Sequence, residues 1–386
     1  MSKLEKFLRG RLASAIVAII VGFLISAIVL AATGYSPLET FAQLLDGAFG
    51  RPKYIANVFI KATPILLTGV SVAFAFKTGL FNIGAEGQYI LGTVLASIVG
   101  IKLNLPMPLQ VPIVLLSGIV GGAALGAFVG WLKARFGIHE VITSIMTNWI
   151  AFYLCNYVVM SDTFHKVNST SALPVSSSSY TMILGSWKKT PEGKEFFSGI
   201  PWLNEIVLKT DLNYGFIIAV AIAIIAAIVL TRTKLGYELR AVGFNRDASR
   251  FSGISVERNI ILSMLIAGAI SGLAGALTIT GISPHTITLL AAMEGYGFNG
   301  MSVAFIAASN PIGCIPASLL FASLIYGGMS VSAPTEIINI MIGIILFFTA
   351  LPGITPFLAD FLAKKRSEQE NMRISKDGTP LPEKEV

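Results

Sequence analysis

The sequence predicts an all-α polytopic membrane protein with about ten transmembrane helices. Of its 386 residues, 54% are hydrophobic and only 13% are charged, and the mean hydropathy is +0.74. A soluble protein carries about 25% charged residues on average, and a soluble fold of this length could not bury so much apolar surface. The apolar residues also come in runs of roughly 20, which is the length that a helix needs to cross a bilayer.

Net charge and cysteine content exclude two other classes of protein. The net charge is +7, but the basic residues lie beside the apolar runs, so we expect no nucleic-acid partner. Both cysteines, Cys155 and Cys314, lie inside apolar segments, which indicates no disulfide framework. The first apolar run is too long for a signal peptide and no small-residue cleavage site follows it, so we expect a retained span.

The first half of the chain contains five predicted spans, at residues 12–33, 55–76, 82–101, 111–132 and 141–160. Between the first two, residues 35–53 are more polar and predict an interfacial helix. A polar outer loop at residues 161–212 follows the fifth span. It is the only region that resembles a small extramembrane lobe.

The second half contains five further predicted spans, at residues 214–230, 260–280, 286–308, 311–328 and 337–361. A charged loop at residues 231–259 separates the first two of these. Because Glu294 and three glycines interrupt residues 286–308, eight spans with one re-entrant segment are the alternative. The membrane domain is then residues 1–363, and residues 364–386 form a charged, disordered tail.

The distribution of Lys and Arg predicts the orientation. With ten spans and the N-terminus inside, 19 of the 28 basic residues lie on the inside, as the positive-inside rule requires. Both termini and the loop at 231–259 are therefore predicted to be cytoplasmic. Residues 79–84 and 297–300 have similar sequences, and each segment lies at the start of a predicted span. In the predicted topology these two spans enter the membrane from opposite sides, which predicts inverted repeats of spans 2–5 and 7–10.

Motifs for the commonest catalytic sites are absent from the sequence. There is no phosphate-binding loop of the type G-x-x-x-x-G-K-[ST], so we expect no ATP bound by this chain. There is no G-x-S-x-G nucleophile motif. His139-Glu140 begins like a zinc-protease motif, but Thr143 stands where the second histidine is required, and the three histidines do not form a cluster. The sequence thus predicts neither an enzyme nor a metal site.

Three polar side chains, Asn82, Glu86 and Gln88, enter the third predicted span among closely spaced glycines. A carboxylate costs about 2.5–3.5 kcal/mol near the bilayer centre and less near the end of a span, so protein or water must satisfy it. One interpretation is a segment that lines a translocation pathway. The other is a buried polar clamp that holds this span against its neighbours.

The fifth span carries a second polar stripe. Ser144, Thr147 and Asn148 share one helix face, with Thr143 beside them. These groups can bind a polar solute or bond across helices, and both interpretations stay open. The neighbouring Trp149 could stack on a flat ring or serve only in packing.

The loop at residues 231–259 mixes apolar and charged residues at helical spacing. Leu235, Leu239 and Val242 fall on one face, and Gly243 is expected to end the helix. We expect this face to dock in a cleft of a cytoplasmic partner, with Arg240, Arg246 and Arg250 at the rim. An amphipathic helix that lies on the membrane surface is the alternative.

Four sequence blocks resemble one transporter family. Residues 79–88 read GLFNIGAEGQ, residues 140–148 EVITSIMTN, residues 236–245 GYELRAVGFN and residues 295–300 GYGFNG. They resemble the permease subunit of bacterial ABC importers in the group for simple sugars, nucleosides and branched-chain amino acids, and are closest to its nucleoside-type branch. The longer outer loop at 161–212 departs from the commoner sugar permeases.

This resemblance implies a multi-pass permease of the bacterial cell membrane, with the ten-span importer fold and inverted repeats. It implies a separate ABC ATPase subunit that binds the ATP, a second permease subunit, identical or homologous, and a substrate-binding lipoprotein or periplasmic protein. The substrate pathway would include Asn82, Glu86, Gln88, Thr143, Asn148, Trp149, Phe298 and Asn299. The ATPase-coupling surface would include Leu235, Leu239, Arg240, Val242, Gly243 and Arg246.

The function implied is ATP-driven import of nucleosides, with this chain forming half of the pathway. Importers of simple sugars such as ribose are the nearest alternative. An ion-driven secondary transporter is an alternative of another class, but it would need no cytoplasmic docking loop and more intramembrane acids than Glu86. An intramembrane enzyme is disfavoured by the missing catalytic motifs.

Overall fold

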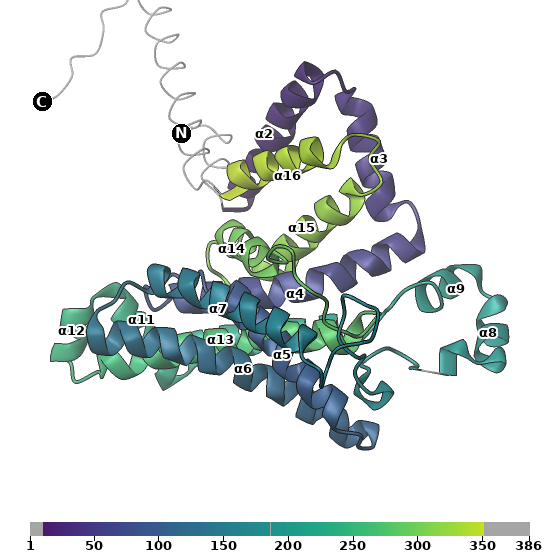
Figure 1. The fold of residues 1–386 in the computed structure, drawn as a ribbon. Helices are drawn as coiled ribbons and strands as arrows, with labels where there is room; N and C mark the ends of the chain where they lie inside the picture. Colours follow the sequence, from purple (N-terminus) through teal and green to yellow (C-terminus); the bar gives the residue numbers. More distant parts are fainter. Residues whose placement is uncertain (1–10, 186, 351–386) are drawn as a thin grey trace, which may run out of the picture. The chain divides into compact units, whose positions relative to one another are not determined.

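The computed structural model describes residues 11–185 and 187–350, and this part of the chain is built of helices, with three isolated β-bridges and no β-strand (Figure 1). The all-α class is therefore confirmed. The chain divides into two compact units, residues 1–41 with 332–386 and residues 42–331. The predicted tail at 364–386 lies outside the described residues.

The first unit is built on the pairing of α2 (Arg11–Ala32) with α16 (Thr335–Ala350). Gly22 lies directly against the backbone of Ile345, where a Cβ would come within 2.8 Å of its Cα. The Ser26 hydroxyl donates to the Met341 carbonyl oxygen at 3.2 Å. A small residue and an interhelical hydrogen bond are typical of helix pairs that associate in membranes.

The second unit contains the predicted spans of the middle of the chain. They are α4 (Pro52–Phe76), α5 (Ala85–Lys102), α6 (Met107–Phe136), α7 (Glu140–Met160), α10 (Gly215–Arg232), α13 (Val256–Gly281), α14 (Tyr296–Ile306) and α15 (Cys314–Gly328). α13 packs against α6 through Gly122, Gly268 and Gly272, where any Cβ would overlap with the backbone of the opposite helix. These glycines let the two helices approach closely.

Five of the described helices are long and apolar enough to cross a membrane, namely α4, α6, α7, α10 and α13. Shorter apolar helices occupy 17–32, 314–328 and 335–348. Together they make the chain a polytopic membrane protein. α5 also forms where a span was predicted, but Glu86 and Gln88 in its first turns lower its hydropathy.

The segment predicted as an interrupted span, residues 286–308, is helical only in part. Only the segment from Tyr296 to Ile306 is helical, and the chain before it is irregular. Gly295 takes a left-handed conformation with φ 83°, which starts the helix α14 at that point. The last predicted span, at 337–361, begins as α16, and its residues after 350 lie outside the described part of the chain.

Two segments outside the spans have helices of their own. The loop at 161–212 contains η1 (Ser177–Ser179), η2 (Trp187–Lys189), α8 (Pro191–Ser198) and α9 (Pro201–Val207). It is held to the end of α13 by backbone bonds such as Thr181 N–H to the Thr280 carbonyl at 2.9 Å. The loop at 231–259 contains α11 (Lys234–Phe244) and α12 (Arg246–Phe251).

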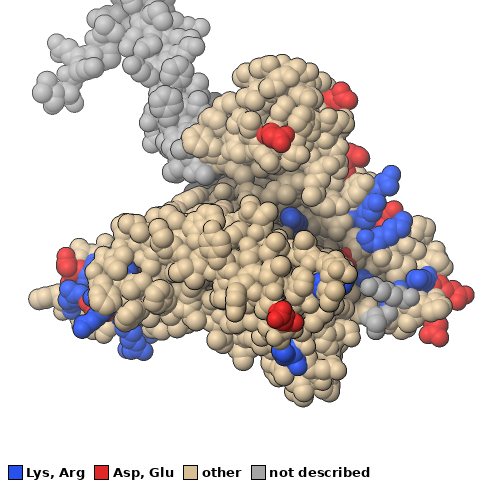
Figure 2. Space-filling view, viewed as in Figure 1, with Lys and Arg blue, Asp and Glu red and all other residues tan. Residues whose placement is uncertain are grey.

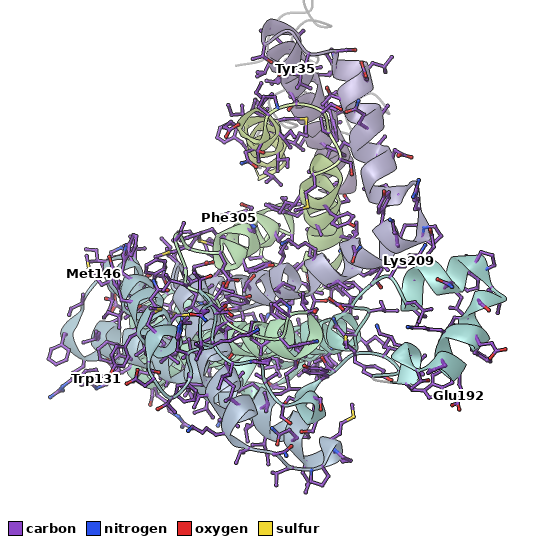
Figure 3. All side chains as sticks on the ribbon, turned by 45° about the vertical axis from the view of Figure 1, so that its right-hand side comes forward. Tyr35, Trp131, Met146, Glu192, Lys209 and Phe305 are labelled. Carbon is purple, nitrogen blue, oxygen red and sulfur yellow. The ribbon has the colours of Figure 1, made fainter. Side chains whose placement is uncertain are left out.

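Charged side chains of the second unit gather mainly at its two ends, over α11–α12 and on the side of α8 and α9 (Figure 2). Figure 3 shows Trp131 and Met146 toward one of these ends and Glu192 and Lys209 toward the other. On the face that Figure 2 shows, the surface between the ends carries few charged side chains, as expected for helices in contact with lipid. The loop at 161–212 and the loop at 231–259 therefore lie on opposite sides of the bundle.

Candidate functional site

The segment between α4 and α5 is held by a buried amide pair. Asn82 Nδ2 donates to Gln88 Oε1 at 2.9 Å, and Gln88 Nε2 donates back to Asn82 Oδ1 at 3.1 Å. Asn82 also donates to the Ser71 hydroxyl, which in turn donates to the Ala267 carbonyl oxygen of α13. Asn82 lies just before α5 rather than inside it. Both amides are buried, so this network fixes the turn that begins α5.

Glu86 joins the start of α5 to the start of α14. Its two carboxylate oxygens accept from the backbone N–H groups of Gly295 at 2.7 Å and of Gly297 at 2.6 Å. These are unpaired donors at a helix N-terminus, where a negative charge is stabilising. Gly297 permits the contact, because a Cβ there would overlap with the Glu86 backbone. The buried carboxylate is thus satisfied inside the chain.

Asn148 of α7 holds the other side of the same turn. Its Oδ1 accepts from Gly87 N–H at 2.8 Å, and its Nδ2 donates to the Ile83 carbonyl oxygen at 3.1 Å. Thr143 bonds within its own helix, to the His139 carbonyl oxygen. The contacts of Asn82, Glu86, Gln88 and Asn148 are therefore those of a polar clamp, and their place on the solute pathway remains a prediction.

Three of the predicted pathway residues do reach the surface of this chain. Trp149 is 47% exposed and Phe298 is 38% exposed, while Asn299 is half-buried. Trp149 stacks on Tyr153, with 6.1 Å between ring centroids and 29° between planes. Side chains on this surface can meet a solute, or a second subunit, without breaking internal bonds.

The structure adds a polar cluster that motif reading missed. Lys61 Nζ donates to the Tyr296 hydroxyl at 3.0 Å and lies 5.0 Å from the centre of that ring. The Tyr89 hydroxyl donates to Glu294 Oε2 at 3.0 Å, and the rings of Tyr89 and Tyr296 are 5.1 Å apart. In the sequence, the only sign of this cluster is that Lys61 and Glu294 each lie inside an apolar run. A charged residue at such a place is by default a candidate for a functional site.

The loop at residues 231–259 folds as a helix pair, as predicted, but its apolar face points inward. Leu239 is 0% exposed and Val242 1% exposed, and Val242 packs in a buried cluster with Leu80 and Val256. The prediction that these two residues fill a cleft in a partner is therefore wrong. Helical spacing identifies an apolar face, and here this chain itself covers that face. Leu235 is half-buried.

Other residues of the helix pair face outward. Phe244 is 90% exposed and Phe251 97% exposed, and Tyr237 is also exposed. Arg246 and Arg250 line a recess of about 250 Å³ together with Lys133 at the end of α6. Arg250 also pairs with Glu257 at 2.5 Å. Arg240 is half-buried and donates to the carbonyl oxygen of Gly236.

Gly243 does not end the first helix, contrary to prediction. α11 continues to Phe244, and Asn245 separates the helices by capping α12 with a hydrogen bond from Ala248 N–H at 3.0 Å. Gly243 instead lies against residues 77–79, where a Cβ would overlap with the Lys77 carbonyl oxygen. The loop at residues 231–259 therefore touches the segment that leads into the polar clamp.

A comparison with protein families decides which family this is. Residues 54–350 match the family described as the permease component of the branched-chain amino acid transport system. The chain belongs to this permease family. The match covers the clamp, the polar cluster and the loop at residues 231–259. Since the family is one of permeases and not of enzymes, it supports the prediction that the chain is not an enzyme.

Curated relatives of this permease span nearly its whole length. A guanosine ABC transporter permease of Bacillus subtilis is 34% identical over 354 residues, which are 91% of this chain and 96% of the relative. A nucleoside ABC transporter permease of Lactococcus lactis is 33% identical, over 92% and 97%. A glucose ABC transporter permease of Haloferax volcanii is 27% identical, over 86% and 85%. No solved structure gave a significant match.

Proposed function

We propose that this permease forms half of an ATP-driven import pathway for nucleosides in the bacterial cell membrane. The observation that carries the proposal is the similarity, over more than nine tenths of both chains, to permeases named for guanosine and for nucleosides. A separate ABC ATPase supplies the energy and binds the ATP. A second permease completes the pathway, and a substrate-binding lipoprotein or periplasmic protein delivers the solute.

The proposal includes ten spans, inverted repeats and cytoplasmic termini, with residues 1–363 as the permease domain and 364–386 as its tail. The contact between the starts of α5 and α14 supports the proposal of inverted repeats. Gly79, with φ 69°, precedes α5, and Gly295, with φ 83°, precedes α14. Helices that begin inside the membrane domain with their N-termini close together are a feature of transporter folds built from inverted repeats.

In this proposal the predicted site residues divide into two roles. Asn82, Glu86, Gln88 and Asn148 position the starts of α5 and α14, because their polar groups are bonded within the chain. Trp149, Phe298 and Asn299 face the solute, since they are accessible. Thr143 lies beside the clamp on α7 and contributes packing.

The exposure of side chains on α11 and α12 changes which residues we propose for the surface that couples to the ATPase. Phe244 and Phe251 replace Leu239 and Val242 as the residues that dock on the ATPase, because buried aromatic anchors dominate most interfaces. Arg246 adds charge at the rim, where an exposed ion pair contributes about 0–1 kcal/mol. Motion of this surface reaches the clamp through the contact of Gly243 with residues 77–79.

We expect Phe244→Ala and Phe251→Ala each to weaken ATPase binding by about tenfold. The reason is the loss of a side chain whose exposed ring is buried only in the complex. Pull-down of the ATPase by the purified permease measures the effect. Phe196→Ala is the matched control, because Phe196 is exposed on α8 at the other end of the bundle. Equal binding by all four proteins would reject this docking surface.

The orientation is tested by cysteine labelling. Both native cysteines are buried, so their background labelling is low. A membrane-impermeant maleimide should label Glu192→Cys in intact cells and Asn245→Cys only after the membrane is opened. Labelling of Asn245→Cys in intact cells would contradict the proposed topology.

The substrate class is tested by competition in cells that depend on this permease for uptake. Labelled guanosine should accumulate, and unlabelled nucleosides should compete while ribose and leucine should not. Accumulation of labelled ribose that nucleosides do not reduce would reject the nucleoside proposal in favour of a sugar importer.

A further inference from the structure

A pair of opposite charges lies within the membrane domain, on α4 and at the start of α14. Lys61 is the tenth residue of α4, and Glu294 directly precedes Gly295, the cap of α14. Lys61 is half-buried and Glu294 is exposed, so both reach the surface of this chain. A charged side chain at such a place is costly and marks a solute or ion pathway by default.

The two charges are held in place by aromatic hydroxyls. Fully buried Tyr89 donates to Glu294 Oε2 at 3.0 Å, and Lys61 donates to the Tyr296 hydroxyl at 3.0 Å. The Tyr296 backbone is fixed in turn, since its carbonyl oxygen accepts from the Thr68 hydroxyl at 2.8 Å. Side chains that are held by such bonds are ordered before a ligand arrives, which lowers the cost of binding.

Each charge retains hydrogen-bonding capacity. Within residues 11–185 and 187–350, no group donates to Glu294 Oε1, and Lys61 uses one of its three ammonium donors, on Tyr296. The site therefore offers a carboxylate acceptor bonded to Tyr89 and an ammonium donor bonded to Tyr296, and Phe298 is exposed on the same helix, α14.

We propose that Glu294 binds the vicinal hydroxyl groups of the ribose of a ribonucleoside, and that Lys61 and Tyr296 complete this site. A carboxylate accepts two hydroxyl donors at once, whereas a solute that lacks them would leave the charge unpaired. The inference rests on the proposed function, because it assumes that a nucleoside enters the pathway. It adds that this permease, and not only the delivering protein, distinguishes a ribonucleoside from its dideoxy analogue.

The test compares two substrates in the reconstituted transporter. Uptake of guanosine and of 2′,3′-dideoxyguanosine is measured at concentrations that saturate the substrate-binding protein. The ratio of the two rates is then compared between wild type and Glu294→Gln. The same binding protein serves both permeases, so its own selectivity cancels from the comparison. The wild type is expected to prefer guanosine, and the ratio of the two uptake rates should fall by about tenfold in Glu294→Gln. A factor of this size corresponds to the loss of one hydrogen bond to a charged group.

Two further variants keep the outcome decisive. Tyr89→Phe releases Glu294 Oε2 without removing the carboxylate, and it should lower the preference in the same direction by a smaller factor. It decides the matter if Glu294→Gln does not assemble. Glu192→Gln removes a carboxylate from the exposed surface of α8 and should leave the ratio unchanged.

The failure of this inference differs from the failure of the proposed function. A wild-type transporter that takes up guanosine and its dideoxy analogue equally, or variants that keep the wild-type ratio, would overturn the role of Glu294 alone. A wild-type transporter that takes up neither nucleoside would overturn the proposed function itself.

Discussion

Replacing Gly243 by valine is expected to lower ATP-driven uptake by at least tenfold. Gly243 lies on α11 against residues 77–79, and even a Cβ would overlap with the Lys77 carbonyl oxygen and press on the backbone of Thr78 and Gly79. Relief of such overpacking requires backbone shifts that cost about 1–3 kcal/mol. The shift would separate the coupling helices from the segment that leads through Asn82 to α5, so ATP hydrolysis would no longer drive the pathway.

The measurement is uptake together with ATP hydrolysis by the reconstituted complex. We expect Gly243→Val to keep bound ATPase and some hydrolysis while losing uptake. Gly199→Val is the matched control, because no atom beyond its two chain neighbours lies within 4 Å of a Cβ built at Gly199. Arg246→Ala should have a smaller effect than Gly243→Val, since an exposed arginine contributes little. Normal uptake by Gly243→Val would show that this contact does not transmit motion.

Replacing Glu86 by alanine is expected to destabilise the permease and abolish uptake. The change leaves the N–H groups of Gly295 and Gly297 without their acceptor at a buried helix start. Hydrogen bonds to charged groups contribute about 1.5–3 kcal/mol each. Glu86→Gln should also be damaging, because one carboxylate oxygen is replaced by an N–H donor that would face another donor.

Thermal unfolding of the purified complex separates the two interpretations of Glu86. A positioning role predicts that Glu86→Ala and Glu86→Gln both unfold at lower temperature than wild type, with uptake lost in parallel. Glu192→Gln, on the exposed surface of α8, should unfold as wild type does. If the Glu86 variants kept full thermal stability and lost only uptake, direct contact of Glu86 with the solute would replace the capping role.

The long apolar helices could be predicted from the sequence to within a few residues. The predicted spans at 55–76, 111–132 and 141–160 correspond to α4, α6 and α7, because a run of apolar residues about 20 long has few other stable conformations near lipid. The short helix α14 could not be predicted in this way. Its start depends on the left-handed Gly295 and on the cap that Glu86 supplies from a helix about 200 residues earlier.

The sequence identified which residues form the polar clamp, but not which groups those residues contact. The polar residues of α5 and α7 were identified, but whether they bond to a solute or to each other depends on which helices meet. Leu239 and Val242 show the same difficulty, since periodicity reveals an apolar face and not what covers it. Lys61 and Glu294 are 233 positions apart, so only the fold brings them to the same tyrosine pair.

The central claim is that this permease serves ATP-driven nucleoside import. The most direct measurement is the accumulation of labelled guanosine in proteoliposomes that contain the permease, its partner permease and the ATPase, with the substrate-binding protein outside. The account predicts that guanosine accumulates inside only when ATP is enclosed, and that an imposed ion gradient without ATP produces none. Accumulation driven by the ion gradient alone, or no accumulation of guanosine with ATP, would contradict it.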